Sequence, residues 1–519
     1  MTVFLLPLVV LLLLVPGDDK PAPKLPLGKE TTYVIGPLDK HGYIDYEAAL
    51  NAELSRGVTA QNNANVLLIQ AFGPAPEGGD GLPLAYFKWL DLPPLPKEGD
   101  YFVSLSGFAR DTLSLTDAQL TALYDQQSAT MTRPWATQDN PVIAEWLKAN
   151  EKPLALVVEA TKRPRYYNPL VTRKRDGEPG ALIGFLLPSV QKCRELAVAL
   201  TARAMLRVHD KKFDDAWADL LACHRLGRLV AQGGTLIESL VGFALGQIAS
   251  TATLTYLDQV PLTSKQIRER SAELQQLPPW PTFAERVDLG ERFLGLDSLQ
   301  NIRRSQLQGL DFGDDEDRKL TAEELKALEA LDWAAMFREV NRWYDRMVAA
   351  ARQPSRAERM KAFAALDDEL IKLTKKKIGP RQALALLGKP DQTAKTISLS
   401  IVHTLMGLLL PSFQRVQGAY DRVEQVGRNL QVAFALAAYR ADTGKYPAKL
   451  DDLVPNYLAK VPGDLFSGKQ LIYRAEKAGY VLYSVGQNEM DDGGRSFDDD
   501  PPGDDLLVKM PLPPLKRQE

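Results

Sequence analysis

Acidic side chains gather in one short stretch near the C-terminal end of the chain. Residues 487–505 carry eight carboxylates and one arginine, a net charge of −7 in a protein whose total is −3. Carboxylates this close together repel one another. A hard cation such as Ca²⁺, which takes about six to eight oxygen ligands, would relieve the repulsion. Gly493 and Gly494 would let the loop wrap tightly around it. The alternative is an acidic loop that is simply solvated.

Other residues that could do chemistry are few and scattered. The four histidines (His41, His209, His224 and His403) do not pair at metal-ligand spacing, which argues against the usual zinc sites. The chain has no His-Glu-x-x-His, no Gly-x-Ser-x-Gly and no phosphate-binding glycine loop. We therefore expect no catalytic residues and favour a non-enzymatic role. Dispersed acids leave open a glycosidase-like carboxylate pair, which sequence alone cannot nominate.

The elements that position these residues belong to a large chain. A length of 519 residues predicts two to four domains. Hydrophobic residues make up 45% and charged residues 25%, which is ordinary for a folded protein. The small net charge gives no reason to expect nucleic acid as a partner.

An apolar run opens the chain, from Phe4 to Val15. Twelve helical residues rise about 18 Å, well short of the roughly 30 Å hydrocarbon core of a membrane. The run is typical of a secretory signal. We expect residues 1–17 to be a signal peptide, 18–30 to be a linker, and the protein to be exported to the periplasm or cell envelope. Membrane contact would come only from an uncleaved N-terminal segment. The alternative is a buried N-terminal helix.

Helical patterns dominate the next 360 or so residues. We expect a mainly helical N-terminal domain at 31–180, which includes a helix at Tyr46–Leu54, and a central helical bundle or solenoid-like region at 181–392. Within it, the runs 190–208 and 214–230 are joined by a short polar turn and predict a helical hairpin. Its second half has a weak resemblance to a tetratricopeptide repeat, carried by Ala216, Leu220 and Cys223.

The last part of the chain differs in kind. A long helix is expected from about Thr393 to Asp442, because apolar residues recur on it every seven positions. Gly444 stands where a left-handed helix stop is expected. The short runs 471–474 and 480–485 predict a β-hairpin. The expected fold class is therefore mainly α, with a small α+β domain at 393–512 that consists of a long helix and a short antiparallel sheet. Residues 513–519 form a tail.

This C-terminal stretch resembles the globular domain of the major (G-type) pseudopilin of the bacterial type II secretion system. The resemblance lies in Pro411 after an apolar run, the segment 438–447 (Ala-Tyr-Arg-Ala-Asp-Thr-Gly-Lys-Tyr-Pro), and Tyr483-Ser484-Val485-Gly486 before the acidic loop. In that family the loop binds calcium. The resemblance implies that the ligands here are Asn488, Asp491, Asp492, Asp504 and Asp505, with backbone carbonyls near Ser484.

The pseudopilin family begins with a leader, a cleavage site and an apolar helix, whereas here some four hundred other residues precede the domain. An echo of the cleavage motif at 234–238 (Gly-Thr-Leu-Ile-Glu) lies deep inside the helical region, and we interpret it as coincidence. We expect an exported cell-envelope protein that binds or scaffolds protein partners. One alternative is a structural subunit of a secretion or pilus-like machine, and another is an envelope hydrolase.

Overall fold

The computed structural model describes residues 23–79, 81–172, 181–187, 189–304, 321–322, 326, 329–374, 394–410 and 413–515. The expected signal peptide at 1–17 and the first part of the expected linker lie outside these residues. The protein is 58% helix and 5% strand, with a small three-stranded antiparallel sheet near the C-terminus. The predicted fold class is therefore confirmed.

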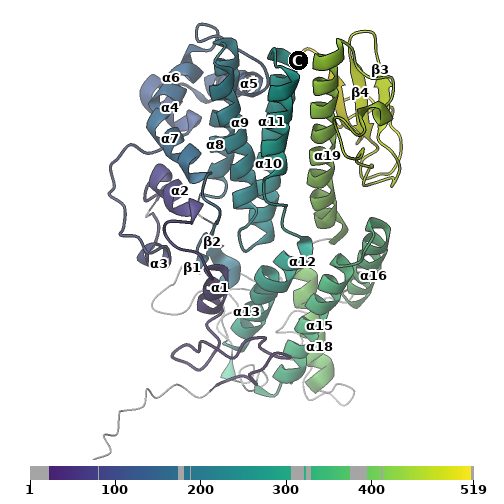
Figure 1. Ribbon diagram of the computed structural model, residues 1–519. Coiled ribbons are helices and arrows are strands. Elements are labelled where there is room, and N and C mark those ends of the chain that lie inside the picture. The colour runs from purple at the N-terminus through teal and green to yellow at the C-terminus, as the bar shows by residue number, and fades with distance from the viewer. Residues whose placement is uncertain are drawn as a thin grey trace, which may run out of the picture.

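Short helices form the N-terminal region, on the left of Figure 1. The predicted helix at Tyr46–Leu54 is present as α1, and the side chain of Asp45 caps it by accepting from the Ala48 N–H. The helices that follow are α2 (Ala64–Phe72), α3 (Leu84–Trp89), α4 (Leu105–Leu113), α5 (Asp117–Thr132), α6 (Pro141–Ala149) and α7 (Glu151–Ala160). A two-residue strand, β1 (Val171–Thr172), pairs antiparallel with β2 (Phe185–Leu186); the 3₁₀ turn η1 (Leu182–Gly184) precedes β2.

Long helices run side by side through the upper half of the molecule (Figure 1). They are α8 (Lys192–His209), α9 (Phe213–Val230), α10 (Leu236–Gln259) and α11 (Ser264–Gln275). The predicted helical hairpin corresponds to α8 and α9, and on one face of α9 the side chains of Trp217, Leu220 and His224 are buried. Helices α2, α4–α10 and α19 contribute to the same hydrophobic core, so this core spans residues on both sides of position 180.

A second helical layer fills the lower half of the molecule (Figure 1). Its elements are α12 (Phe283–Arg286), the π-turn η2 (Val287–Glu291), α13 (Arg292–Arg303), α15 (Trp333–Ala351), α16 (Arg356–Thr374) and α18 (Ala394–Leu409). A separate core lies between them, built around large side chains such as Phe293, Trp343 and Phe363.

The C-terminal part begins with α19 (Phe413–Thr443), which ends at Gly444 with φ of 75°, as the helix-stop pattern predicts. The 3₁₀ turn η3 (Leu450–Leu453) and the strands β3 (Ile472–Ala475), β4 (Tyr480–Ser484) and β5 (Leu506–Met510) follow, in the sheet order β3-β4-β5. The predicted hairpin corresponds to β3 and β4; β5 was not predicted.

One long helix from Thr393 to Asp442 was expected, but the described residues form two. Helix α18 stops at Leu409, and Leu410 is not helical. The physical reason is Pro411, because the residue before a proline is pushed away from helical backbone angles. After Pro411, helix α19 is described from Phe413.

Helix α19 belongs to several cores at once. Phe413, Tyr420 and Val423 pack into the lower core. Leu430 and Phe434 pack into the upper core, where α19 contacts α10 and α11. Its opposite face, with Val432, Ala433, Ala435 and Leu436, contributes to the core under the sheet. Figure 1 shows α19 standing between the long helices and the sheet. The helix thus joins the C-terminal module, residues 413–515, to the rest of the protein.

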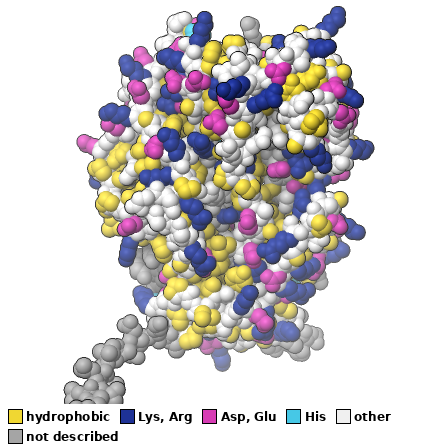
Figure 2. Space-filling model, viewed as in Figure 1, with side chains coloured by type: hydrophobic (Ala, Val, Ile, Leu, Met, Phe, Trp, Pro, Cys, Tyr) yellow, Lys and Arg dark blue, Asp and Glu magenta, His cyan; other side chains and the backbone are white. Residues whose placement is uncertain are grey.

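Among the described residues, two stretches are long and apolar enough to cross a membrane by length and composition alone: Leu236–Gln259, which is α10, and Ala394–Thr443, which includes both α18 and α19. Their most apolar windows are 61% and 56% buried inside the protein, which core helices also show. On the face shown in Figure 2, acidic and basic side chains are interspersed, as suits a net charge of −3.

Candidate functional site

The acidic loop connects two neighbouring strands of the small sheet. Strand β4 ends at Ser484 and β5 starts at Leu506, and these two residues face each other in the antiparallel ladder. The ladder therefore holds both ends of the loop, residues 485–505, next to each other. Residues far apart along the loop are brought together in this way.

Three of the expected ligands form one group. One carboxylate oxygen from each of Asp492, Asp504 and Asp505 lies within 4.8 Å of the other two. Asp505 is buried, with 2% of its surface exposed. Backbone N–H groups hold the acids in place: Gly494 donates to Asp505 Oδ2 (2.7 Å) and Asp504 donates to Asp492 Oδ2 (3.1 Å).

Two carboxylate oxygens in this group have no hydrogen-bond donor within the described chain. They are Asp504 Oδ1 and Asp505 Oδ1, and both are buried. A buried acceptor without a donor costs free energy, and a cation bound here would satisfy both. Gly486, at φ of 70°, allows the close approach, because a Cβ there would lie 2.5 Å from Asp504 Oδ1. The donor set is all oxygen, as Ca²⁺ prefers. The residues present therefore fit the ion.

The other two expected ligands have different positions. Asn488 borders the group: its amide NH₂ donates to Asp492 Oδ2 (2.9 Å), and its backbone N–H donates to Asp504 Oδ2 (2.9 Å). Asp491 lies outside the group of three. Its Oδ1 accepts from the Tyr483 hydroxyl and from the Gly493 N–H, each at 2.9 Å. Its role in the structure is to hold the loop against β4.

The pKa values of Asp505 and Asp492 are shifted in opposite directions. Burial raises the pKa of Asp505, and the charges of Asp492 and Asp491 add to the rise. The hydrogen bond from Asn488 lowers the pKa of Asp492, with help from the Asp504 N–H and from Arg495, whose Nη2 lies 3.6 Å away. The ionised group therefore carries negative charge that its protein neighbours only partly offset.

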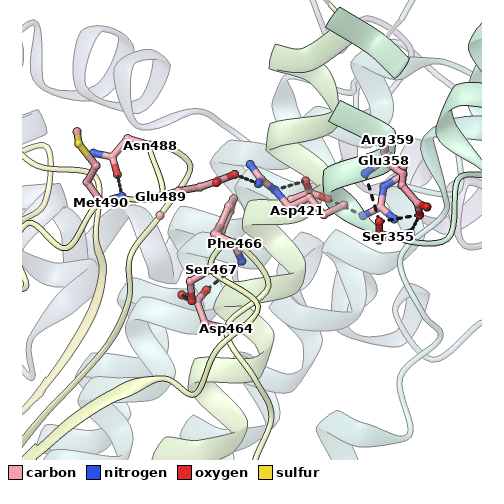
Figure 3. Close-up of polar contacts among 12 residues, drawn as sticks. Ser355, Glu358, Arg359, Asp421, Asp464, Phe466, Ser467, Asn488, Glu489 and Met490 are labelled. Atoms are coloured by element: carbon pink, nitrogen blue, oxygen red, sulfur yellow. Dashed lines mark hydrogen bonds and ion pairs between the residues drawn. The ribbon is translucent and has the colours of Figure 1, made fainter. Parts of the chain in front are cut away.

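The loop is attached to the helical body by Glu489 (Figure 3). Its carboxylate pairs with Nη1 of Arg356, at the start of α16. The same guanidinium bonds through Nε to Asp421 of α19 (3.1 Å) and stacks over Phe466, 4.8 Å from the ring centre. The acidic loop, helix α19 and the segment that contains Phe466 thus meet at one buried arginine.

Sequence reasoning missed Asp464, which supports the start of the loop. Its side chain is buried and accepts from the Ser484 hydroxyl (2.7 Å), the Ser467 hydroxyl (2.7 Å) and the Phe466 N–H (3.1 Å). Asp464 follows Gly463 in a turn-forming segment, where an Asp side chain commonly bonds to the backbone two residues on. That pattern was the available signal.

The segment 234–238, which is similar to the pseudopilin cleavage motif, has a structural role. Thr235 and Glu238 form a capping box at the start of α10, in which each side chain bonds to the backbone N–H of the other. Glu238 is fully buried and also accepts from Asn168 Nδ2 (3.2 Å). Burial raises the pKa of Glu238 to about 7. The motif thus begins a core helix.

Comparisons of the chain with protein-family models, curated proteins and solved structures find no match. The resemblances to a pseudopilin and to a tetratricopeptide repeat therefore stay predictions.

Proposed function

We propose that this protein is an exported cell-envelope protein that acts by binding and scaffolding, with a C-terminal module whose acidic loop is stabilised by calcium. The observation that carries the proposal is the pair of buried acceptors, Asp504 Oδ1 and Asp505 Oδ1, that face no donor in the described chain. A third carboxylate, from Asp492, lies within 4.8 Å. The apolar run at Phe4–Val15 supports export.

The helical body supports the scaffolding part of the proposal. It supplies a large surface, and helix α19 connects the helical body to the module through shared cores. A long helix followed by a small antiparallel sheet, with the acidic loop between two strands, also fits the order of elements that the pseudopilin resemblance implies. Calcium would act here as a structural ion that fixes the loop for contact with a protein partner.

Thermal unfolding in a calcium titration tests the loop. A ligand that binds only the folded state stabilises it, by about 2.7 kcal/mol at a hundred times its Kd. The melting temperature should therefore rise with millimolar calcium, and Asp505→Asn should abolish the rise. Asp500→Asn is the matched control, since Asp500 is an exposed acid of the same loop. If calorimetry detects no calcium binding at millimolar concentration, the loop is only a solvated acidic patch.

N-terminal sequencing of the native protein tests export. Mature protein in the envelope fraction should begin near Asp18, after removal of residues 1–17. Intact Met1 on protein recovered from the cytoplasm would overturn the localisation. A protein that polymerises and extracts from membranes together with pseudopilins would instead favour a structural subunit of a secretion machine.

A further inference from the structure

A cavity lies where the helical body meets the C-terminal module, and its lining includes none of the proposed calcium ligands. Its volume is about 240 Å³, and it opens to the surface. Helices α9 and α10 form one wall, α19 forms the opposite wall, and the segment after α11 closes one end with Trp280. Much of the lining is apolar, including Leu274, Val423 and Phe434. The cavity is therefore of the size and character that suits a small ligand with an apolar body.

One cation in this cavity, Arg228, has no hydrogen-bond or ion-pair partner among the described residues. Arg228 of α9 stacks on Trp280, with Cζ 3.7 Å from the ring centre. Stacking uses the flat face of a guanidinium and leaves its five N–H donors at the edge. Across the described residues, no acceptor bonds to these donors and no carboxylate pairs with them. The nearby Glu424 acts on Arg228 only through its charge, which raises the pKa of the arginine, and its Oε1 accepts from Arg428 Nε at 3.2 Å.

Burial makes this unpaired charge costly. It lowers the pKa of Arg228 to about 10, although Glu424 opposes the shift. His224, which also lines the cavity, adds no positive charge at neutral pH, since burial lowers its pKa to about 3. Thr253 donates its single hydroxyl hydrogen to Ala249 O (2.8 Å), so it must accept from Nε2 of His224 (3.0 Å). Burial keeps the imidazole neutral, and the hydrogen bond to Thr253 fixes its orientation.

A glycine keeps the cavity open from the opposite wall. Gly427 lies inside α19, where glycine costs helix stability of about 1 kcal/mol relative to alanine. A Cβ at Gly427 would meet no atom within 4 Å, so no close packing requires a glycine at this position. By contrast, Gly246 on the facing helix is needed for packing, because a Cβ there would come within 2.8 Å of Trp280. The absence of a side chain at position 427 leaves room in the cavity.

We propose that this cavity binds a small organic anion, whose carboxylate pairs with the edge of the Arg228 guanidinium while its apolar body lies against Trp280, Val423 and Phe434. An arginine fork matches a carboxylate with two parallel hydrogen bonds. The ligand would bridge α9 and α19 and so join the helical body to the C-terminal module. This site is separate from the acidic loop and does not depend on calcium.

Isothermal titration with two matched probes, 1-naphthoate and its neutral analogue 1-naphthamide, tests the proposal on the full chain. Naphthoate should bind in a saturable, one-to-one manner, and naphthamide at least tenfold more weakly. Arg228→Met should weaken naphthoate at least tenfold and leave naphthamide nearly unchanged. Arg440→Met is the matched control, because it also removes an arginine stacked on an aromatic ring, Tyr446, at 5.1 Å.

A second variant keeps the test valid if Arg228→Met does not fold. Gly427→Leu places a side chain into the open space and should abolish binding of both probes while the far-UV circular dichroism and melting temperature are kept. The proposal is overturned if naphthoate does not bind saturably, if the amide binds equally well, or if both cavity variants bind naphthoate like the unmodified protein.

Discussion

Arg356 and Glu489, which lie 133 residues apart in the sequence, form an ion pair that joins helix α16 to the acidic loop. The arginine is buried, whereas 55% of the glutamate side chain is exposed. The same arginine pairs with Asp421, which is 3% exposed. One guanidinium therefore neutralises a buried carboxylate on α19 and holds the loop in place beside it (Figure 3).

Replacing Arg356 should be much more damaging than replacing Glu489. Arg356→Met leaves the buried Asp421 without its main partner, although Gln417 (2.9 Å) and Arg359 (3.6 Å) remain. We expect a loss of about 3 kcal/mol in the free energy of unfolding. Glu489→Gln, at the exposed end, should cost about 1 kcal/mol or less. Urea unfolding of both variants makes the comparison, and equal losses would contradict it.

Compared with the unmodified protein, Asp505→Asn should be at least as stable without calcium and less stable with calcium. The pKa of Asp505 is raised in the folded state, so the folded protein binds more protons than the unfolded chain above the ordinary value of 3.8. In EGTA, the free energy of unfolding should therefore fall as pH rises from 3.8 through the raised pKa of Asp505. Asparagine lacks the charge but can still accept from the Gly494 N–H.

The variant should thus be at least as stable as the unmodified protein in EGTA at pH 7, yet fail to respond to calcium. Unfolding curves between pH 3.5 and about pH 7 measure this. If the variant were equally destabilised at both ends of the range, the carboxylate would have a purely structural role.

His224 should make the protein less stable in mild acid. Its pKa is lowered to about 3 by burial, with Arg228 adding to the effect, whereas the unfolded value is 6.5. Between pH 6.5 and about pH 3, His224 is protonated in the unfolded chain but not in the folded protein. The contribution of His224 is therefore complete above pH 6.5 and is lost as pH falls toward 3.

Between pH 6.5 and 4 this amounts to about 3 kcal/mol. The variant His224→Gln can still donate to Thr253 but does not titrate. The difference between its pH profile and that of the unmodified protein isolates the histidine. Parallel profiles would show that His224 is not buried as a neutral ring.

The two glycines that line the cavity should respond to alanine with opposite signs. Gly427→Ala should raise the free energy of unfolding by about 1 kcal/mol, because the added methyl meets only open space and alanine favours a helix. Gly246→Ala should lower it by about 2 kcal/mol, since the methyl would collide with Trp280. Thermal and chemical unfolding provide the measurement, and a shift of the same sign in both variants would contradict the cavity geometry.

Local patterns were sufficient for much of the fold. Three features were predicted: the helix at Tyr46–Leu54, the hairpin of α8 and α9, and the helix stop at Gly444. Each depends on capping residues or apolar periodicity, which involve residues close together in the sequence. Strand β5 was missed: its five residues alternate between buried and exposed, but they directly follow a loop whose charge dominated the interpretation. The break at Leu410 was missed although Pro411 signalled it.

The candidate sites depend on contacts that no local pattern records. The acidic loop was found by its composition, yet the division between Asp491, which bonds to Tyr483, and the group at Asp492, Asp504 and Asp505 depends on how the chain turns. Arg228 and Gly427 lie on helices about 200 residues apart, and only packing brings them to one cavity. Periodicity indicates which face of each helix is buried, but not what it packs against.

Because helix α19 is made late in synthesis, the core that it shares with α10 and α11 can form only near the end of synthesis. The faces of α10 and α11 that receive Leu430 and Phe434 are made more than 150 residues earlier. Until α19 has left the ribosome, those faces have no cover from it, and exposed apolar surface invites aggregation. A chain that stops short of residue 430 would lack Leu430 and Phe434 and would keep these faces exposed. The final fifth of the sequence therefore completes two hydrophobic cores whose other helices are made before it.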